Sequence, residues 1–242
     1  MSTDHLAVLR AECRHVSELA RTIDHAAPIP HLPGWTVHDV IAHLTGDFLW
    51  VLDTLATRQR PTTGIVPVEA RGSALCDEWD AVAARLVAQL DGVDPDEPCP
   101  NFAHGDRGRL GFHVPHQAFE TTIHRWDVEA ATGSHAPIDP VVAIDAIDEL
   151  FATYTVRYSP HALYEPVVLG CFDAPAAWRV APDARDGFVT VERCDGTEPD
   201  VSAGAADLLL LLWQRIAPDD GRITHRVDPA GVRPFFEGPV TA

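Results

Sequence analysis

The sequence contains no lysine, so all 18 of its basic residues are arginine. Lysine-based catalysis, including Schiff-base chemistry, is therefore excluded. The 18 basic residues stand against 36 acidic ones, which gives a formal net charge of −18. A surface this acidic repels phosphate backbones and anionic membranes, so we expect no nucleic-acid partner and no membrane partner. A small anionic substrate stays compatible with this charge, because one locally positive pocket is enough to bind it.

Long apolar runs and a cysteine framework are missing as well. No stretch of about 18 apolar residues occurs, and the charged, amphipathic N-terminus lacks the apolar core of a signal peptide. We therefore expect a cytoplasmic protein. The five cysteines show no CxxC or CxxxC spacing, which favours reduced, mostly buried thiols over disulfides or a cysteine-based zinc site. Cys99, in PCPN, is the one cysteine whose setting suggests exposure, and it is a weak candidate for a nucleophile.

Helical periodicity dominates the first half of the chain. Apolar residues at spacings of three and four predict helices over about residues 3–25, 37–58, 68–90 and 115–133. The second helix has a clear start, since Thr36 can act as its N-cap and Asp39 can close a capping box. The long connection over residues 91–114 is rich in Pro, Gly and Asp and is typical of a functional loop. Four amphipathic helices with one long crossover indicate a four-helix bundle.

The pattern changes after HAPID, residues 135–139. A helix over residues 140–157 is followed by short β-like runs, PVVLGCF, AWRVAP, GFVTVER and PDVSAG, and then by the strongly apolar helix ADLLLLLWQRIA. Strands interleaved with a buried helix are typical of a small α+β domain. The sequence therefore predicts a helical bundle over residues 1–137 and an α+β domain over residues 138–242.

The stretch HQAFETTIHRWDVEAATG, residues 116–133, carries metal-capable side chains at four-residue spacing. Glu120 and His124 share one helical face, so they can bind one ion together. His43 lies in the apolar segment VIAHL of another helix, where a histidine must be hydrogen-bonded or ligated. Two imidazoles and one carboxylate with open positions suit zinc or another divalent ion. His116 is interpreted as a neighbour of the ligands or as substrate-facing.

A simpler interpretation of these residues stays open. An amphipathic helix with a charged outer face often carries a Glu-x-x-x-His pair, and a lone core histidine is more often hydrogen-bonded than ligating. His38, His104 and His113 are expected at the surface or in loops. Asp127, three residues after His124, either orients the imidazole of that histidine or belongs to a solvated helix face.

Three segments resemble those of one known family. PGWTVHDVIAHLTGD, HQAFETTIHRWDVEAATG and ADLLLLLWQRI occur in the order found in the mycothiol-dependent maleylpyruvate isomerase family. The resemblance implies a mainly α, α+β protein, with a DinB-like four-helix bundle followed by a small sterol-carrier-like α+β domain. It also implies a divalent metal, usually zinc, on His43, Glu120 and His124. Mycothiol would bind at this metal, and the C-terminal domain would help to close the site.

The implied chemistry is that of an activated thiol. Metal coordination lowers the pKa of a thiol, and the resulting thiolate can add to a conjugated cis double bond and leave after rotation, which is isomerisation. The same thiolate can attack an electrophile and stay, which is S-transfer. The partners are then a small thiol and a small electrophilic substrate.

Individual roles follow from this chemistry. Arg215 is the candidate for holding a substrate carboxylate, with Arg125 and Arg226 as alternatives, and His116 is the candidate cofactor-binding residue. Two other functions stay open, a non-catalytic metal- or ligand-binding protein and a metallohydrolase that uses metal-bound water.

Overall fold

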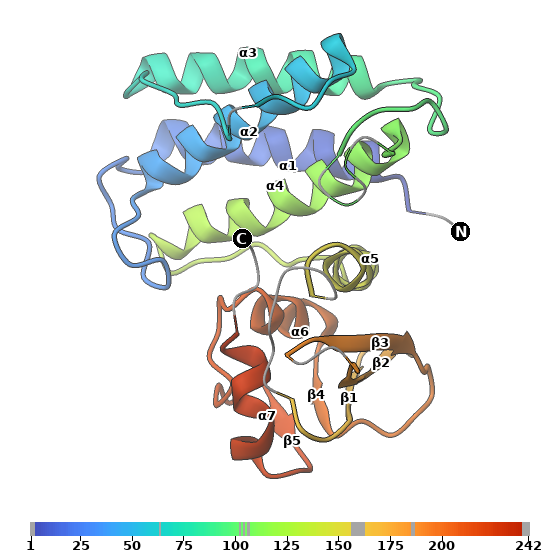
Figure 1. Cartoon of the computed structure of the whole chain (residues 1–242). Helices are drawn as coiled ribbons and strands as arrows, with labels where there is room; N and C mark the ends of the chain where they lie inside the picture. The colour runs from blue at the N-terminus through green and yellow to red at the C-terminus, as the bar shows by residue number, and fades with distance from the viewer. Residues whose placement is uncertain are drawn as a thin grey trace. The chain divides into compact units, whose positions relative to one another are not determined.

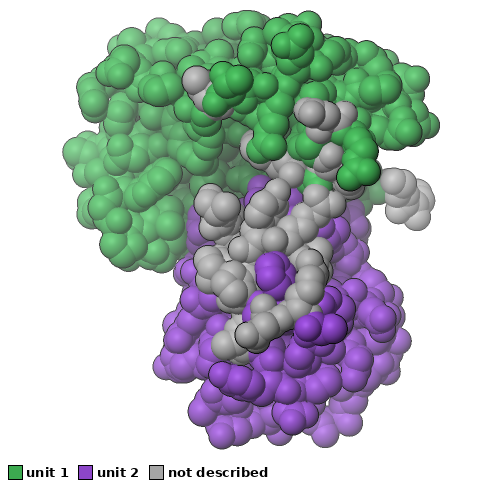
Figure 2. All heavy atoms as spheres, viewed as in Figure 1, with its two compact units in different colours: residues 1–136 green, residues 137–242 purple. Residues whose placement is uncertain are grey.

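The chain divides into two units, Met1–Ala136 and Pro137–Ala242 (Figure 2). The structure is a computed structural model, and it describes residues 3–62, 64–101, 103, 105, 107–155, 163–184 and 187–238. Within these ranges no helix is both long enough and apolar enough to cross a membrane.

Four long helices form the first unit (Figure 1). They are α1 (His5–Thr22), α2 (Val37–Thr57), α3 (Ser73–Leu90) and α4 (His113–Ala130), and the short 3₁₀ turn η1 (Leu110–Phe112) precedes α4. Helix α1 packs against α4 and α3, and α2 packs against the same two helices, which closes a four-helix bundle. The core of this unit contains Leu9, Ile41, Trp79 and Ile123, all fully buried. The predicted bundle is confirmed, with helix ends within a few residues of those expected.

The start of α2 determines where its functional side chains lie. Thr36 accepts a hydrogen bond from the backbone N–H of Asp39, and the Asp39 carboxylate accepts one from the Thr36 N–H at 2.8 Å. The predicted capping box is therefore present. Hydrogen bonding from Thr36 holds the pKa of Asp39 below its usual value. A cap of this kind stabilises a helix by about 1 kcal/mol, and it sets the rotational phase of His43 two turns later.

The second unit is an α+β layer structure. Helix α5 (Pro140–Leu150) continues into a π-helical turn, η2 (Phe151–Thr155), and packs against α6 (Ala205–Leu212). The five strands are β1 (Val167–Cys171), β2 (Ala177–Pro182), β3 (Val189–Arg193), β4 (Val201–Ala203) and β5 (Thr224–His225). They are ordered β3-β2-β1-β4-β5, and only β1 and β4 run parallel to each other among the pairs of this sheet. The last helix is α7 (Pro229–Phe236).

Two predicted helices of this unit end earlier than expected. The α-helical part of the segment predicted over residues 140–157 ends at Leu150, and residues 156–162 lie outside the described ranges. Helix α6 ends at Leu212, because the chain turns through a left-handed conformation at Gln214, with φ of 58°. The Gln214 side chain then donates a hydrogen bond to the Phe236 carbonyl at 2.9 Å, which ties this turn to the end of α7. Periodicity alone did not signal this turn.

Candidate metal centre

Helices α2 and α4 bring the three candidate ligands together. The imidazoles of His43 and His124 lie edge to face, with ring centroids 4.9 Å apart. The His124 Nε2 atom lies 3.6 Å from the Glu120 Oε2 atom. Two imidazoles on one tetrahedral ion keep their centroids about 5 Å apart, given Zn–N bonds of about 2.0–2.1 Å. The separation of the two imidazoles therefore has the size expected for two ligands of one ion.

His116 lies on the opposite side of Glu120 from His124. Its Nε2 atom is 4.0 Å from the Glu120 Oε1 atom, and its ring stacks on Phe112 with centroids 4.8 Å apart. The His116 side chain is buried. Glu120 is thus flanked by one imidazole a turn before it and another a turn after it.

Asp47 joins this cluster, although the sequence argument assigned it no role. It lies on α2 one turn after His43, is 7% exposed, and its Oδ2 atom has no hydrogen-bond partner among the described residues. Burial, reinforced by the charge of Glu120, raises the pKa of Asp47 to about 6, and the imidazoles of His116 and His124 oppose this rise. The signal was present as the His43-x-x-x-Asp47 spacing, which mirrors the Glu120-x-x-x-His124 spacing on the facing helix.

The donor set fits a divalent cation electrostatically. Burial and the nearby charge of Glu120 raise the cost of ionising Asp47, and a cation would relieve that cost. Oxygen and imidazole nitrogen are the donors that zinc accepts. In the part of the chain that the structure describes, however, no group of three or more His, Cys, Asp or Glu side chains is already arranged to hold a metal ion. Binding would therefore require the side chains to adjust.

Replacing Asp47 by Asn should test whether the ionised Asp47 carboxylate destabilises the metal-free protein. Since the folded pKa is raised from 3.8 to about 6, ionised Asp47 destabilises the metal-free fold above pH 6. We expect Asp47→Asn to stabilise the metal-free protein by up to about 3 kcal/mol at pH 8, at about 1.4 kcal/mol per pKa unit. The gain should shrink as the pH falls from 6 toward 4, because the folded wild type then takes up its proton.

Denaturant unfolding at several pH values measures the Asp47 effect, with Asp53→Asn, an exposed position of the same helix, as the matched control. With added Zn²⁺ the wild type should become more stable than Asp47→Asn, because the wild-type carboxylate then offsets the charge of the ion. If Asp47→Asn stabilised the protein equally at pH 4 and pH 8, ionisation of Asp47 would not be the cause.

The other nitrogen of His124 is held by Asp127. The His124 Nδ1 atom lies 2.9 Å from the Asp127 Oδ2 atom, and Asp127 is 0% exposed. Asp127 therefore does not belong to a solvated helix face, and the structure supports its orienting contact with the imidazole. Ligating histidines commonly make such a contact with a carboxylate.

A pocket of about 500 Å³ opens beside His43 within the first unit. Its polar lining includes His38, Asp39, His43, Glu69 and Arg71. One wall is the segment around Val66, which approaches α2 so closely that a Cβ on Gly46 would lie 2.2 Å from the Val66 carbonyl oxygen. Glycine at position 46 thus allows the wall to form. Burial and Arg71 lower the pKa of His38, which is half-buried on α2 rather than in a loop.

Cys99 and His113 are both buried, contrary to expectation. Cys99 is 1% exposed, and its Sγ atom lies 3.7 Å from the His113 Nε2 atom, which also lies 2.9 Å from the Pro100 carbonyl oxygen. Burial raises the pKa of the Cys99 thiol and lowers the pKa of His113 to about 4. A thiolate–imidazolium pair is therefore disfavoured, and this Cys–His contact lacks the electrostatics of a nucleophile. His104 lies outside the described residues.

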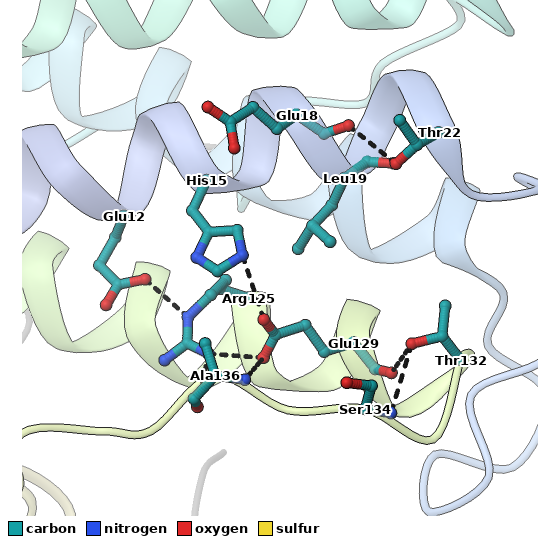
Figure 3. A network of polar contacts seen from close by, with 10 residues as sticks. All are labelled: Glu12, His15, Glu18, Leu19, Thr22, Arg125, Glu129, Thr132, Ser134 and Ala136. Carbon is teal, nitrogen blue, oxygen red and sulfur yellow. Dashed lines mark hydrogen bonds and ion pairs between the residues drawn. The ribbon is translucent and has the colours of Figure 1, made fainter.

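Arg125 lies in a buried network of hydrogen bonds within the first unit. Its guanidinium is buried and donates to Glu12 at 2.7 Å, to Glu129 at 2.5 Å and to the Ala136 carbonyl at 3.1 Å (Figure 3). Glu129 also accepts a hydrogen bond from the Ala136 N–H. These contacts tie α4 to α1 and to the end of the first unit, and they use the donors of Arg125 inside the protein, which disfavours Arg125 as the residue that binds a substrate carboxylate.

The other two candidate arginines lie in the second unit. Arg215 follows α6, where its Nη1 atom donates to the Trp213 carbonyl at 2.9 Å and its guanidinium lies over the Trp213 ring. Arg226 is exposed and forms an ion pair with Glu198. Arg215 is therefore the better oriented of the two, since a backbone carbonyl and an aromatic ring constrain its guanidinium.

Known proteins share both the fold of this chain and the sequence pattern of its first unit. The fold, a four-helix bundle followed by an α+β unit, is shared by the crystal structures of the mycothiol-dependent maleylpyruvate isomerase and of a histidine-to-alanine mutant of it. They show 16% and 17% identity and TM-scores of 0.56 and 0.58, and each comparison covers 87% of this chain and 91% of the other. Residues 9–129, half of the chain, match the mycothiol maleylpyruvate isomerase N-terminal domain family. The chain belongs to this family. No curated protein matches it.

Proposed function

We propose that this protein is a metal-dependent enzyme that uses a low-molecular-weight thiol, mycothiol, as cofactor or co-substrate. Its reaction is either the cis–trans isomerisation of a maleylpyruvate-like substrate or the transfer of the thiol to an electrophile. The observation that carries the proposal is the convergence of His43, Glu120 and His124 from α2 and α4. Beside them lies a carboxylate oxygen of Asp47 that has no hydrogen-bond partner among the described residues. Membership of the family supports the choice of thiol.

The proposed ligands of the divalent ion, zinc in the first instance, are His43, Glu120 and His124. When bound, the ion would lower the pKa of a coordinated thiol, so that thiolate is available near neutral pH. Asp127 holds the Nδ1 edge of His124 and so directs the Nε2 edge toward Glu120. His116, next to Glu120, is proposed to lie beside the cofactor and to steady that carboxylate.

The pocket beside His43 is the proposed entrance for the thiol. Its polar lining supplies both donors and acceptors, with Arg71 and the carboxylates of Asp39 and Glu69. Trp35 packs edge to face against His43, with centroids 5.4 Å apart, and adds an aromatic side chain to the lining of the pocket. Such a lining suits a polar, largely uncharged thiol compound better than a polyanion.

Arg215 is the proposed anchor for a substrate carboxylate, by bidentate hydrogen bonding. Arg215→Gln should lower kcat/KM for a carboxylate-bearing electrophile about 10- to 100-fold, since a charge-assisted hydrogen bond contributes about 1.5–3 kcal/mol. The kcat/KM of the same variant for an uncharged alkylating agent should not change. Steady-state kinetics with both substrates measure this, and Arg226→Gln, at the exposed pair with Glu198, serves as the control. Equal losses on both substrates would argue against a carboxylate contact.

Turnover should depend on an added thiol and not on a protein thiol. Burial raises the pKa of Cys13 and of Cys171 to about 12 and also raises that of Cys99, so these thiols stay protonated at neutral pH. We expect the five single Cys→Ser variants to keep the thiol-dependent rate, apart from modest losses of stability at buried positions. The assay measures the rate at which maleylpyruvate and simple alkylating agents are turned over, with and without mycothiol.

The same assay separates the competing functions. A full rate without thiol would indicate a metallohydrolase, and a collapse in Cys99→Ser would indicate an enzyme nucleophile. Metal binding without affinity for the thiol, measured by calorimetry, would indicate a non-catalytic binding protein.

A further inference from the structure

The loop between α1 and α2 reaches the candidate metal centre through one buried carboxylate. We propose that His31 is a positioning residue, which holds His124 through Asp127 so that the His124 Nε2 atom faces Glu120 and His43. This inference rests on the proposed metal site. It adds a residue that is 96 positions away from Asp127 in the sequence and that no motif of the chain indicates.

The contacts form a continuous line of polar atoms. The His31 Nε2 atom lies 2.6 Å from the Asp127 Oδ1 atom, and the His124 Nδ1 atom lies 2.9 Å from the Asp127 Oδ2 atom. The His124 Nε2 atom then faces the Glu120 carboxylate at 3.6 Å. Each oxygen of Asp127 thus takes one imidazole, and one end of the line is a ligand of the proposed centre.

An ionised Asp127 carboxylate determines which atom donates in each of these two hydrogen bonds. An ionised carboxylate only accepts hydrogen bonds, so both facing ring nitrogens donate. His124 is therefore held as the tautomer with its proton on Nδ1, which leaves the lone pair on Nε2 available for a metal ion. Loss of one of these donors would weaken the hydrogen bonding of a fully buried carboxylate, which is costly.

His31 is itself held in place by its surroundings. Its ring packs against Trp126 of α4 with centroids 4.9 Å apart. The loop around it is closed by the Ile29 N–H, which donates to the Trp35 carbonyl at 2.9 Å, and Ile29 is buried. The side chain of His31 is 14% exposed. The loop therefore presents the imidazole at a defined position rather than as a solvated side chain.

The experiment uses two substitutions in the full-length protein. His31→Gln keeps a side-chain N–H donor, and His31→Phe keeps a ring against Trp126 but removes the donor. The matched control is His135→Phe, because His135 also stacks on Trp126, with centroids 4.2 Å apart. Melting temperatures of all variants report on folding.

Two readouts decide the proposal. The first is the ¹⁵N NMR signature of His124 in the metal-free protein, which distinguishes the two tautomers. We expect a single Nδ1–H tautomer in the wild type, in His31→Gln and in His135→Phe, and a mixture in His31→Phe. The second is Zn²⁺ affinity by chelator competition, where His31→Phe should bind up to about 10-fold more weakly, the lower end of the range for losing the direct partner of a ligand, because His31 acts on His124 through Asp127.

The experiment distinguishes failure of the His31 inference from failure of the proposed metal-dependent function. If the wild type binds no Zn²⁺, the metal proposal fails, while the tautomer measurement still tests the role of His31. A wild type in which His124 carries its proton on Nε2, or in which neither His31 nor His124 shows a hydrogen-bonded N–H, overturns the inference even if His31→Phe does not fold. A folded His31→Phe with an unchanged tautomer and unchanged Zn²⁺ affinity overturns it as well.

Discussion

Replacing His43, Glu120 or His124 by alanine should release the divalent ion and abolish thiol-dependent turnover. The wild type should retain about one ion per chain, as a three-residue catalytic site does. Each variant loses one of the three proposed ligands, so its metal affinity should fall further than the roughly 10- to 100-fold typical of outer partners. Turnover should vanish with the ion, because an uncoordinated thiol with a pKa near 8.5 is mostly protonated at neutral pH.

Metal analysis after dialysis against a weak chelator measures this loss. The matched control is His38→Ala, on the same helix as His43, whose imidazole contacts Arg71 instead of α4. It should keep the ion. Removal of the ion from the wild type with a strong chelator should reproduce the activity loss, and adding Zn²⁺ back should restore it. Full occupancy in all three alanine variants would rule out this ligand set.

The second large effect concerns stability, at the buried ion-pair network of the first unit. Arg125→Met should destabilise the fold by about 3–5 kcal/mol, because it leaves the buried Glu129 carboxylate without its cation. The ring of His15, whose Nε2 atom lies 3.2 Å from the Glu129 Oε1 atom, would be the nearest remaining cation, and only when protonated. Figure 3 shows how Arg125, Glu12 and Glu129 converge between α1 and α4.

Denaturant unfolding with a second substitution tests the cause of that loss. In Arg125→Met with Glu129→Gln the stranded charge is removed, so the double variant should be more stable than Arg125→Met alone. The control is Arg10→Met, which breaks the exposed pair with Asp91 and should change stability far less. Strictly additive effects of the two network substitutions would show that the two side chains do not depend on each other.

The Arg125 network and the candidate metal centre share helix α4 but differ in chemistry. Near Arg125 the carboxylates of Glu12 and Glu129 share one permanent guanidinium and are hydrogen-bonded to it. Near His124 the described residues supply imidazoles and carboxylates, and an oxygen of Asp47 has no partner among them. The second cluster is therefore the one at which we propose that a divalent cation binds.

Local patterns in the sequence determined the helices and half of the site. The capping box of Thr36 and Asp39, the apolar stripes of α1 to α4 and the shared face of Glu120 and His124 all depend on residues within a few positions of one another. Such relations are set by helical geometry, which the sequence encodes directly. The mainly α, α+β fold and the family followed from the same segments, and both are confirmed.

Only the tertiary structure decided which distant groups meet. Asp47 lies beside the site because α2 and α4 pack with one particular rotation, and His31 reaches Asp127 across 96 residues. The burial of Cys99, His113 and Arg125 likewise depends on segments far away in the chain. Periodicity shows which face of a helix is apolar, but it does not show which polar side chain of another element lies opposite. That choice is made by side-chain packing between elements, which no short stretch of sequence contains.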